Sequence, residues 1–295
     1  MTVAQACPIC GNTSISSAFQ VKDFSVSQET FTLKTCNSCH FLFTANAPDK
    51  HAISRYYQSD TYISHTDGKK GLFEKIYQIV RKRTVAGKRK MIQHFTGKQN
   101  GALLDYGCGT GAFLQEMKLS DWKINGVEPD PGARTKAEES TGISILVPDG
   151  LTSLETNSCD AITMWHVLEH VHDLEWTLEQ LKRVLKEDGK LFIAVPNNNA
   201  FDAKQYGAYW AAYDVPRHLY HFTPTTMDSL MKKHGLHVVA KKPMWFDSFY
   251  VSMLSEKYKH GKIVYLSAFI IGMLSNIKAL MQVDSCSSVI YIIAK

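Results

Sequence analysis

Short apolar runs alternate along residues 102–295 with longer segments in which apolar residues recur at every third or fourth position. The short runs predict buried strands, and the longer spacing predicts amphipathic helices, most clearly over residues 174–186. Strands that alternate with helices predict an α/β fold with a doubly wound parallel sheet, whose ligands bind beyond the carboxyl ends of the strands. The expected strands are residues 102–106, 123–128, 143–147, 160–165, 190–196, 237–244 and 289–295.

The chain has 295 residues, which is enough for one large domain and a small appendage. We expect a small cysteine-containing module over residues 1–45, then a tyrosine-rich connector and a basic amphipathic helix over residues 46–98. The α/β domain covers residues 99–295, with a helical insertion at about residues 246–286. The first residues lack the basic and apolar regions of a secretory signal, and seven cysteines do not suit a disulfide framework, so we expect a cytoplasmic location.

Two pairs of cysteines near the N-terminus share the spacing C-x2-C. Cys7 and Cys10 form the first pair, and Cys36 and Cys39 form the second. Such pairs can place four thiolates tetrahedrally around zinc, and the alternating pattern between them predicts a small β-hairpin. Four thiolates leave no open coordination position, so the pattern predicts a structural zinc ion. His40 is an alternative ligand to Cys39, and four free structural cysteines are the alternative to a metal site.

A glycine-containing turn follows the first expected strand, where Gly107, Gly109 and Gly111 precede a helical segment. Such a turn lets the backbone approach a nucleotide closely at a helix N-terminus. The spacing also fits a relaxed dinucleotide fingerprint. Asp105 decides between these ligands, because an acid at the strand end disfavours a pyrophosphate and favours the cationic groups of S-adenosylmethionine. Glu128 ends the next apolar run, about 20 residues beyond the turn, where a carboxylate can accept both ribose hydroxyls.

The segments LLDYGCGTG (residues 103–111) and GVEPD (residues 126–130) resemble class I S-adenosylmethionine-dependent methyltransferases. VLEHV (residues 167–171) is similar to a stretch in many methyltransferases of small molecules and quinone precursors. PRHLYHFTP (residues 216–224) resembles a bacterial subgroup with N-terminal cysteine knuckles. The resemblance implies a Rossmann-like seven-stranded sheet over roughly residues 71–295, with an antiparallel last strand. It also implies donor contacts from Asp105, Gly107, Cys108, Gly109, Gly111, Glu128, Pro129, Asp149 and Trp165.

Two of these implied contacts have a simpler alternative. Asp149 lies in the sequence Pro-Asp-Gly, which is equally typical of a plain turn. The family's usual acidic and apolar pair is not matched there. The thiol of Cys108 is interpreted as a small packing group, so only its place in the glycine turn makes it a donor-site residue.

Methyl transfer from a sulfonium is an in-line displacement that aligns the acceptor and, for a hydroxyl, amine or carbon acid, removes a proton. A histidine suits that base near neutral pH. The candidates, in order, are His218 and His166, followed by Tyr213 and His221, and a buried structural role is the alternative for each. Glu169 and His170 are interpreted as fixing the start of the following helix.

Basic residues are concentrated in one segment of a chain whose net charge is only +5. Residues 69–98 hold ten lysines and arginines against the single acid Glu74. This segment predicts a solvated helix face or a site for the phosphates of a nucleotide-linked substrate, RNA or an anionic membrane. Residues 1–50 balance three lysines with three acids, so the cysteine module lacks a basic face and a nucleic-acid partner is not expected.

Residues 263–281 form a nineteen-residue apolar segment in which Lys278 is the only charge. The length would allow a membrane span. A single crossing is excluded, because the strands expected on either side belong to one sheet and cannot lie on opposite sides of a bilayer. The segment therefore predicts a buried helix, a substrate lid, a dimer contact in an oligomer, or a shallow contact with a membrane surface.

These patterns together predict an S-adenosylmethionine-dependent methyltransferase with a structural zinc ion. The expected acceptor is a hydroxyl or carbon of a small molecule, such as a sugar, a quinone-like compound or another secondary metabolite. Two alternatives stay open, an RNA methyltransferase and a non-catalytic module that binds S-adenosylmethionine.

Overall fold

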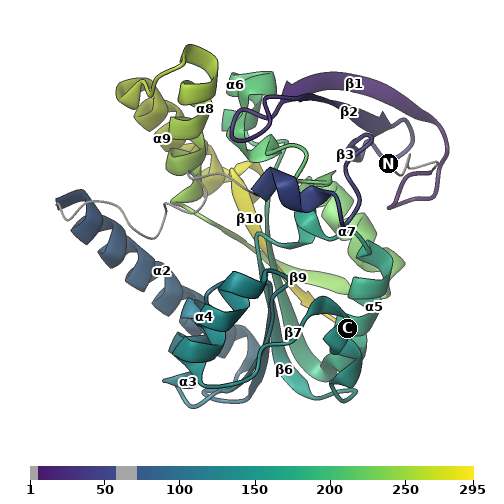
Figure 1. Ribbon diagram of the computed structural model, residues 1–295, viewed down its shortest axis with the longest axis vertical. Helices are drawn as coiled ribbons and strands as arrows, with labels where there is room; N and C mark the ends of the chain where they lie inside the picture. The colour runs from purple at the N-terminus through teal and green to yellow at the C-terminus, as the bar shows by residue number, and fades with distance from the viewer. Residues whose placement is uncertain (1–5, 58–71) are drawn as a thin grey trace. The chain divides into compact units, whose positions relative to one another are not determined.

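The computed structural model describes residues 6–57 and 72–295, with side chains of the first helix described from residue 83 (Figure 1). Several residues of the expected connector and basic segment therefore lie outside the described residues or side chains. They are Tyr62, His65, Lys69, Lys70, Glu74, Lys75, Arg81 and Lys82.

The chain divides into two compact units that interleave along the sequence. The first unit consists of Met1–Ile63, Leu168–His172 and Ala194–Tyr291. The second unit consists of Ser64–Val167, Asp173–Ile193 and Ile292–Lys295. The chain therefore passes between the units several times, and each unit gathers residues that are distant in sequence.

Six strands form the larger sheet, in the order β5-β4-β6-β7-β10-β9. The strand bounds are β4 Ala102–Tyr106, β5 Lys123–Val127, β6 Cys159–Trp165, β7 Leu185–Pro196, β9 His237–Pro243 and β10 Ser288–Ala294. Strand β4 pairs in parallel with both β5 and β6, and Leu103 and Ile162 of these strands are fully buried. The expected α/β fold is confirmed, with β4 and its two neighbours at the centre of the second unit.

The sheet has one strand fewer than expected, because residues 143–147 do not form a strand. Only Leu146 makes a bridge, to Val127, with backbone hydrogen bonds to Gly126 and Glu128 on either side of that residue. Pro148 follows at once and has no amide hydrogen to extend the ladder, so the chain turns into the short helix η2 (Pro148–Ser153). The expectation of a seventh strand was wrong for this physical reason.

Helices of the second unit follow the local signals in the sequence. Helix α4 begins after Asp130, whose side chain accepts a hydrogen bond from the amide of Ala133, and it ends at Gly142 in the left-handed region. Helix α5 buries Leu174, Leu178 and Leu181 along one face, as its spacing predicts. The helix bounds are α2 Leu72–Thr96, α3 Ala112–Lys118, α4 Pro131–Thr141 and α5 Leu174–Val184.

The first unit is built around a second, four-stranded sheet in the order β1-β2-β3-β8. Strands β1 (Ile15–Lys22) and β2 (Thr30–Cys36) form the hairpin predicted between the cysteine pairs. Strand β3 (Leu42–Thr44) then pairs with β8 (Tyr220–His221), which lies in the PRHLYHFTP segment. The cysteine-containing segment thus shares one sheet with a segment almost 180 residues away.

The helices of the first unit range from single turns to the 17 residues of α9. Helix α7 begins as expected at Thr223 and Pro224, where the Thr223 hydroxyl accepts from the amide of Thr226. The bounds are η1 Ile53–Tyr57, η3 Leu168–His170, α6 Phe201–Tyr206, η4 Gly207–Tyr209, η5 Ala211–Tyr213, α7 Pro224–Lys233, α8 Asp247–His260, α9 Tyr265–Met281 and η6 Val283–Ser285.

Helices α8 and α9 form the expected insertion, but α9 is not a buried helix. Its buried positions hold the small residues Ala268, Gly272, Ser275 and Ala279, while nine of its large apolar residues are exposed. A Cβ at Gly272 would lie 2.8 Å from the ring of Phe249, so the small side chains allow α8 and α9 to pack closely. Among the described residues, no helix combines the length and the apolarity that a membrane crossing requires.

Candidate functional site

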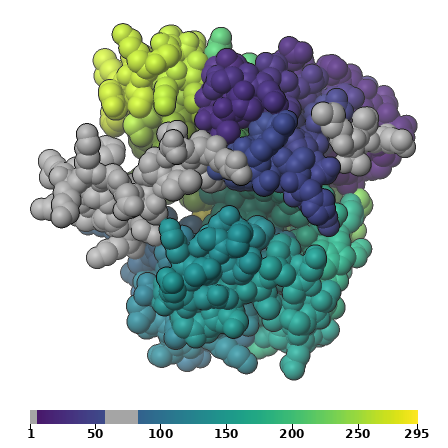
Figure 2. Space-filling view, in the orientation of Figure 1, coloured from purple at the N-terminus to yellow at the C-terminus, as the bar shows by residue number. Residues whose placement is uncertain are grey.

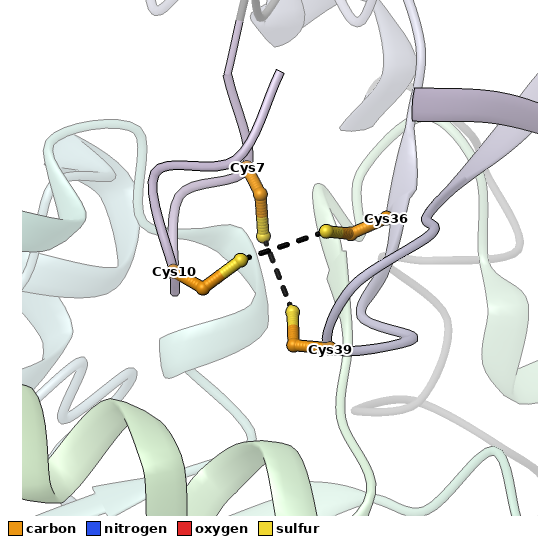
Figure 3. A group of neighbouring side chains, drawn as sticks. All are labelled: Cys7, Cys10, Cys36 and Cys39. Carbon is orange, nitrogen blue, oxygen red and sulfur yellow. Dashed lines mark hydrogen bonds between the residues drawn. The ribbon is translucent and has the colours of Figure 1, made fainter. Parts of the chain in front are cut away.

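The four cysteines of the C-x2-C pairs converge in the first unit (Figure 3). Their sulfur atoms all lie within 4.8 Å of one another, and the Sγ atoms of Cys7 and Cys39 and of Cys10 and Cys36 are 3.5 Å apart. Each pair closes a similar turn, in which the amide of Gly11 or His40 donates to the carbonyl of the first cysteine. His40 is not in the cluster, so the set of converging donors is four thiols, as the spacing predicts.

The glycine turn of residues 107–111 lies at the carboxyl end of β4 in the second unit. Gly107 has a φ of 79°, in the region that favours glycine. A Cβ there would lie 2.4 Å from a methyl carbon of Val167. Gly109, with a φ of 55°, has open space where its Cβ would be, so a ligand can approach its backbone.

Glu128 links this turn to the end of β5. Its Oε2 accepts a hydrogen bond from the amide of Gly109 at 2.8 Å, and its Oε1 accepts from the amide of Asp130 at 2.9 Å. Burial raises the pKa of this carboxyl, and the two amides oppose the shift. Each oxygen has a second lone pair, so the carboxylate can hold the turn and still accept two hydroxyl donors.

Asp105 is buried near the carboxyl end of β4, beside Thr163 of β6. The Thr163 hydroxyl donates to Asp105 Oδ1 at 2.6 Å. Burial raises the pKa of Asp105 to about 6, and the positive charge of Lys88 counteracts part of that shift. A buried carboxylate with a single hydroxyl donor is a favourable place for a positively charged ligand group.

Trp165 borders the same end of the sheet. Its ring meets Phe113 edge to face at 5.6 Å, and Lys88 Nζ lies 4.0 Å from the centre of the indole ring. Lys88 therefore contacts the candidate donor site from α2, although the basic pattern of residues 69–98 predicts only a charged segment. A helix that precedes the glycine turn by many residues gives no local signal for such a contact.

The remaining expected residues of the second unit differ in exposure. Pro129 and Asp149 are exposed, and Asp149 lies in the first turn of η2. Cys108 is buried beside Gly126, and burial raises the pKa of its thiol, which fits a packing role for the side chain. His166 follows β6 with a φ of 58°, an uncommon conformation for a residue other than glycine. The adenine contact implied for Asp149 stays a prediction.

His218 lies in a cluster of titratable groups in the first unit. Ligand atoms of Glu169, His170 and His218 lie within 4.8 Å of one another, and the two imidazole rings meet edge to face at 4.6 Å. Among the described residues, this is the one group besides the cysteines whose donor set could hold a metal ion. Glu169 and His170, expected only to start a helix, are therefore part of the candidate site.

Hydrogen bonds fix which ring nitrogen carries the proton in each histidine. His218 Nδ1 lies 2.8 Å from the carbonyl of Ala212, and His170 Nδ1 lies 3.0 Å from the carbonyl of Arg217 and 3.0 Å from the hydroxyl of Tyr57. A carbonyl only accepts, so both Nδ1 atoms donate when the rings are neutral. The Nε2 atoms of His170 and His218 then carry the lone pairs, and each can accept a proton.

His221 has the opposite arrangement. The Thr44 hydroxyl donates to the carbonyl of His218 at 2.6 Å, so its oxygen accepts from His221 Nε2 at 3.1 Å. The Nε2 of His221 is thereby used in a structural bond. Tyr213 packs against the rings of His221 and Trp210, and burial raises the pKa of its hydroxyl to about 12. Of the four candidates, three lie together in the first unit, and His166 belongs to the second.

Acidification is expected to destabilise the fold through two of these histidines. Burial, followed by the neighbouring His218, lowers the pKa of His170 from 6.5 to about 4, and burial lowers the pKa of His221 well below 6.5. Between these values the unfolded chain binds more protons than the folded chain. The free energy of unfolding should therefore fall as the pH decreases through this window, by up to about 1.4 kcal/mol per pH unit for each histidine.

Urea unfolding at a series of pH values measures this dependence. The His170→Gln variant should show a shallower fall in unfolding free energy over the same window, because it lacks one titrating group. An identical slope in the variant and the original chain would contradict this account of His170.

Arg217 is almost fully buried between two carboxylates in the same unit. Its guanidinium donates to Asp214 at 2.6 and 3.0 Å and to Asp23 at 3.1 Å, and it also donates to the carbonyl of Tyr56 at 2.7 Å. It thereby joins the loop after β1, the end of η1 and the segment before β8.

This chain is similar to known methyltransferases in sequence. The family described as "Methyltransferase domain" matches residues 77–241. An uncharacterized methyltransferase of Bacillus cytotoxicus is 26% identical over 190 residues, which cover 60% of this chain and 85% of the relative. A ubiquinone biosynthesis O-methyltransferase of Cupriavidus pinatubonensis is 22% identical over 191 residues, covering 60% of this chain and 76% of that protein.

One solved structure extends the comparison to the fold. Geranyl diphosphate C-methyltransferase from Streptomyces coelicolor, in complex with S-adenosyl-L-homocysteine, superposes with a TM-score of 0.51 at 14% identity. The match covers 77% of this chain and 85% of that chain. At this identity the likeness concerns the fold alone.

Proposed function

Because this chain belongs to the methyltransferase domain family, we propose that it transfers a methyl group to a hydroxyl or carbon atom of a small molecule. The protein is an S-adenosylmethionine-dependent methyltransferase. The acceptor class is the part that we propose, and it rests on the chemistry of the residues in the first unit.

The donor half of the proposal rests on the second unit. Asp105 supplies a buried negative charge, Gly109 an approachable backbone, and Glu128 two carboxylate oxygens with spare lone pairs. The carboxylate of Asp105 suits the ammonium group of S-adenosylmethionine, and the carboxylate of Glu128 suits its ribose hydroxyls. The backbone of Gly109 leaves room for the ligand to approach closely. We assign them to donor binding on these grounds.

A single observation carries the acceptor half, namely that the basic Nε2 of His218 lies 3.9 Å from Asp214 Oδ2, which can stabilise the ring once it is protonated. Its Nδ1 is committed to the Ala212 carbonyl, so its Nε2 is oriented and unprotonated in the neutral ring. His170, held in the same tautomer, packs edge to face against His218 and helps to orient its ring. A general base of this kind suits a hydroxyl or a carbon acid, whose proton must leave as the methyl group arrives.

Release of S-adenosylhomocysteine in the presence of a panel of acceptors tests the proposal. The panel should contain phenols, sugar nucleotides and unmodified RNA. We expect turnover with a small molecule, and a fall in kcat of roughly 10²- to 10⁴-fold in the His218→Gln variant with unchanged donor affinity. Turnover on RNA alone, or full activity of His218→Gln, would overturn the proposal.

We also propose that the four-cysteine cluster holds a structural zinc ion. Four sulfur atoms within 4.8 Å of one another match the donor set and approximate spacing of tetrahedral zinc coordination. The site then has no position for a substrate or water. Zinc would stabilise the module by joining the segment before β1 to the turn between β2 and β3.

Loss of the Glu128 carboxylate is expected to weaken donor binding about 100-fold. In Glu128→Ala the amides of Gly109 and Asp130 lose their acceptor, and the proposed ribose contacts disappear with them. Calorimetric titration with S-adenosylmethionine measures the change. Glu139→Ala, which removes an exposed carboxylate from α4, is the matched control and should bind normally. Unchanged affinity in Glu128→Ala would remove Glu128 from the donor site.

A further inference from the structure

Helix α9 exposes large apolar side chains along its whole length. Nine of its apolar residues are exposed, among them Leu266 at 72%, Phe269 at 55% and Leu280 at 73% of their surface. Single exposed apolar residues are normal on a protein surface, whereas a continuous group marks an interaction site. The full set is Tyr265, Leu266, Phe269, Ile270, Met273, Leu274, Ile277, Leu280 and Met281. We call these nine residues the α9 face, and Figure 2 shows the side chains of α8 and α9 in yellow-green.

The inner side of α9 carries mostly small residues and a few hydrogen-bonding groups, whereas an ordinary surface helix turns its large apolar side chains inward. Ser275 donates to the buried carboxylate of Asp202 at 2.8 Å, and Ser248 of α8 donates to Asn276 at 3.0 Å. Asp202 also accepts from Trp210 and Ser287, so it anchors a buried hydrogen-bond network. These bonds fix which side of α9 points inward. The apolar side is therefore held outward by the fold itself.

Every charged side chain within residues 257–281, which contain the α9 face, is a lysine. Lys257, Lys259 and Lys262 are exposed at the end of α8 and in the turn that follows, and Lys278 is exposed on α9. Residues 257–281 contain no aspartate or glutamate. Two copies of this surface would bring like charges together, which disfavours a symmetric contact. A surface of anionic lipid headgroups provides the complementary charge.

We propose that the α9 face docks on an anionic lipid surface, with its apolar residues in the outer part of the acyl region and the lysines at the headgroups. The combination of a one-sided apolar helix and adjacent lysines is what interfacial binding requires. The helix lies in the plane of the surface in this arrangement and does not cross it. This inference stands on the surface alone and does not depend on the acceptor.

Sedimentation with vesicles tests the docking. The full chain should sediment with vesicles of phosphatidylcholine and phosphatidylglycerol, and much less with vesicles of phosphatidylcholine alone. Lys259→Ala and Lys262→Ala should each weaken binding about fivefold, and added salt should weaken it further. Equal binding to both kinds of vesicle would overturn the anionic part of the proposal.

Substitutions on the α9 face separate docking from a general change in the protein. Leu266→Glu should weaken vesicle binding about tenfold or more, because a mostly exposed leucine loses its contact with the acyl region. Leu119→Glu is the matched control, since Leu119 is 78% exposed and lies outside the insertion. Circular dichroism of both variants confirms that the fold is retained. Equal loss of binding in both variants would overturn the assignment to α9.

The oligomeric state provides the competing outcome. Light scattering in the absence of vesicles should give the same mass for the original chain and for Leu266→Glu. A dimer that dissociates in Leu266→Glu, together with no vesicle binding, would assign the α9 face to a second copy and overturn the lipid proposal. Absence of both dimer and vesicle binding would overturn it as well.

Discussion

Removal of zinc is expected to unfold the four-stranded sheet of the first unit. Without the metal, the four thiol groups have no common ligand, and only hydrogen bonds and a small apolar core hold the segment before β1 against the turn after β2. Structural zinc sites in small modules contribute on the order of 10 kcal/mol to folding. The Cys36→Ser variant and a strong chelator should both lower the unfolding temperature of the enzyme and release about one zinc ion per chain.

Metal analysis and thermal unfolding measure this expectation together. Cys159→Ser is the matched control, because Cys159 is fully buried but lies outside the cluster. The control should keep its zinc and lose only the modest stability expected of a buried substitution. A folded, fully stable protein that contains no zinc, or a Cys36→Ser variant with unchanged stability, would rule out a structural zinc.

Loss of the Arg217 guanidinium is expected to destabilise the enzyme by about 3–5 kcal/mol. Arg217 is 1% exposed, and its removal in Arg217→Ala leaves the carboxylates of Asp23 and Asp214 without the charge that now pairs with them. Burial raises the pKa of both carboxyls, but the guanidinium holds the pKa of Asp214 below its usual range, and the amide of Ser27 together with the guanidinium does the same for Asp23. The buried Asp23 and the partly buried Asp214 would then have to be protonated or hydrated for the chain to fold.

Urea unfolding followed by tryptophan fluorescence gives the free energy of this variant. Arg55→Ala provides a matched control, since the Arg55 side chain is 64% exposed and its ion pair with Glu29 spans 3.6 Å. The control should lose less than about 1 kcal/mol. A similar loss in both variants would mean that Arg217 contributes no more than a surface arginine. Arg217→Lys should recover part of the stability, because it restores the charge without the forked hydrogen bonds.

Residues that work through their immediate neighbours could be predicted from the sequence. The Cys7 and Cys10 pair closes its own turn, Thr223 caps the helix that follows it, and the glycines from Gly107 onward form the turn that their spacing predicts. Such features depend on backbone geometry within a few residues. Their spacing therefore contains most of the structural information.

Contacts between distant segments could not be predicted in the same way. Lys88 reaches Trp165 from another helix, and Tyr57 reaches His170 across 113 positions of sequence. Glu169 and His170 precede α5 by only a few residues, so their local sequence predicts a helix start. Only the fold brings them close to His218. The same reason explains α9, whose apolar pattern is the same for a buried helix and for an exposed one.

The pairing of β3 with β8 limits how this protein can be divided or recombined. Leu42 and Phe43 pair with His221 and Tyr220, so the cysteine-containing segment supplies the strand that covers the backbone of the PRHLYHFTP segment. A chimera that exchanged the first 45 residues for those of a relative would also exchange a neighbour of His218 and His221. In terms of heredity, the two segments form a single module that must be inherited together, although almost 180 residues separate them in the sequence.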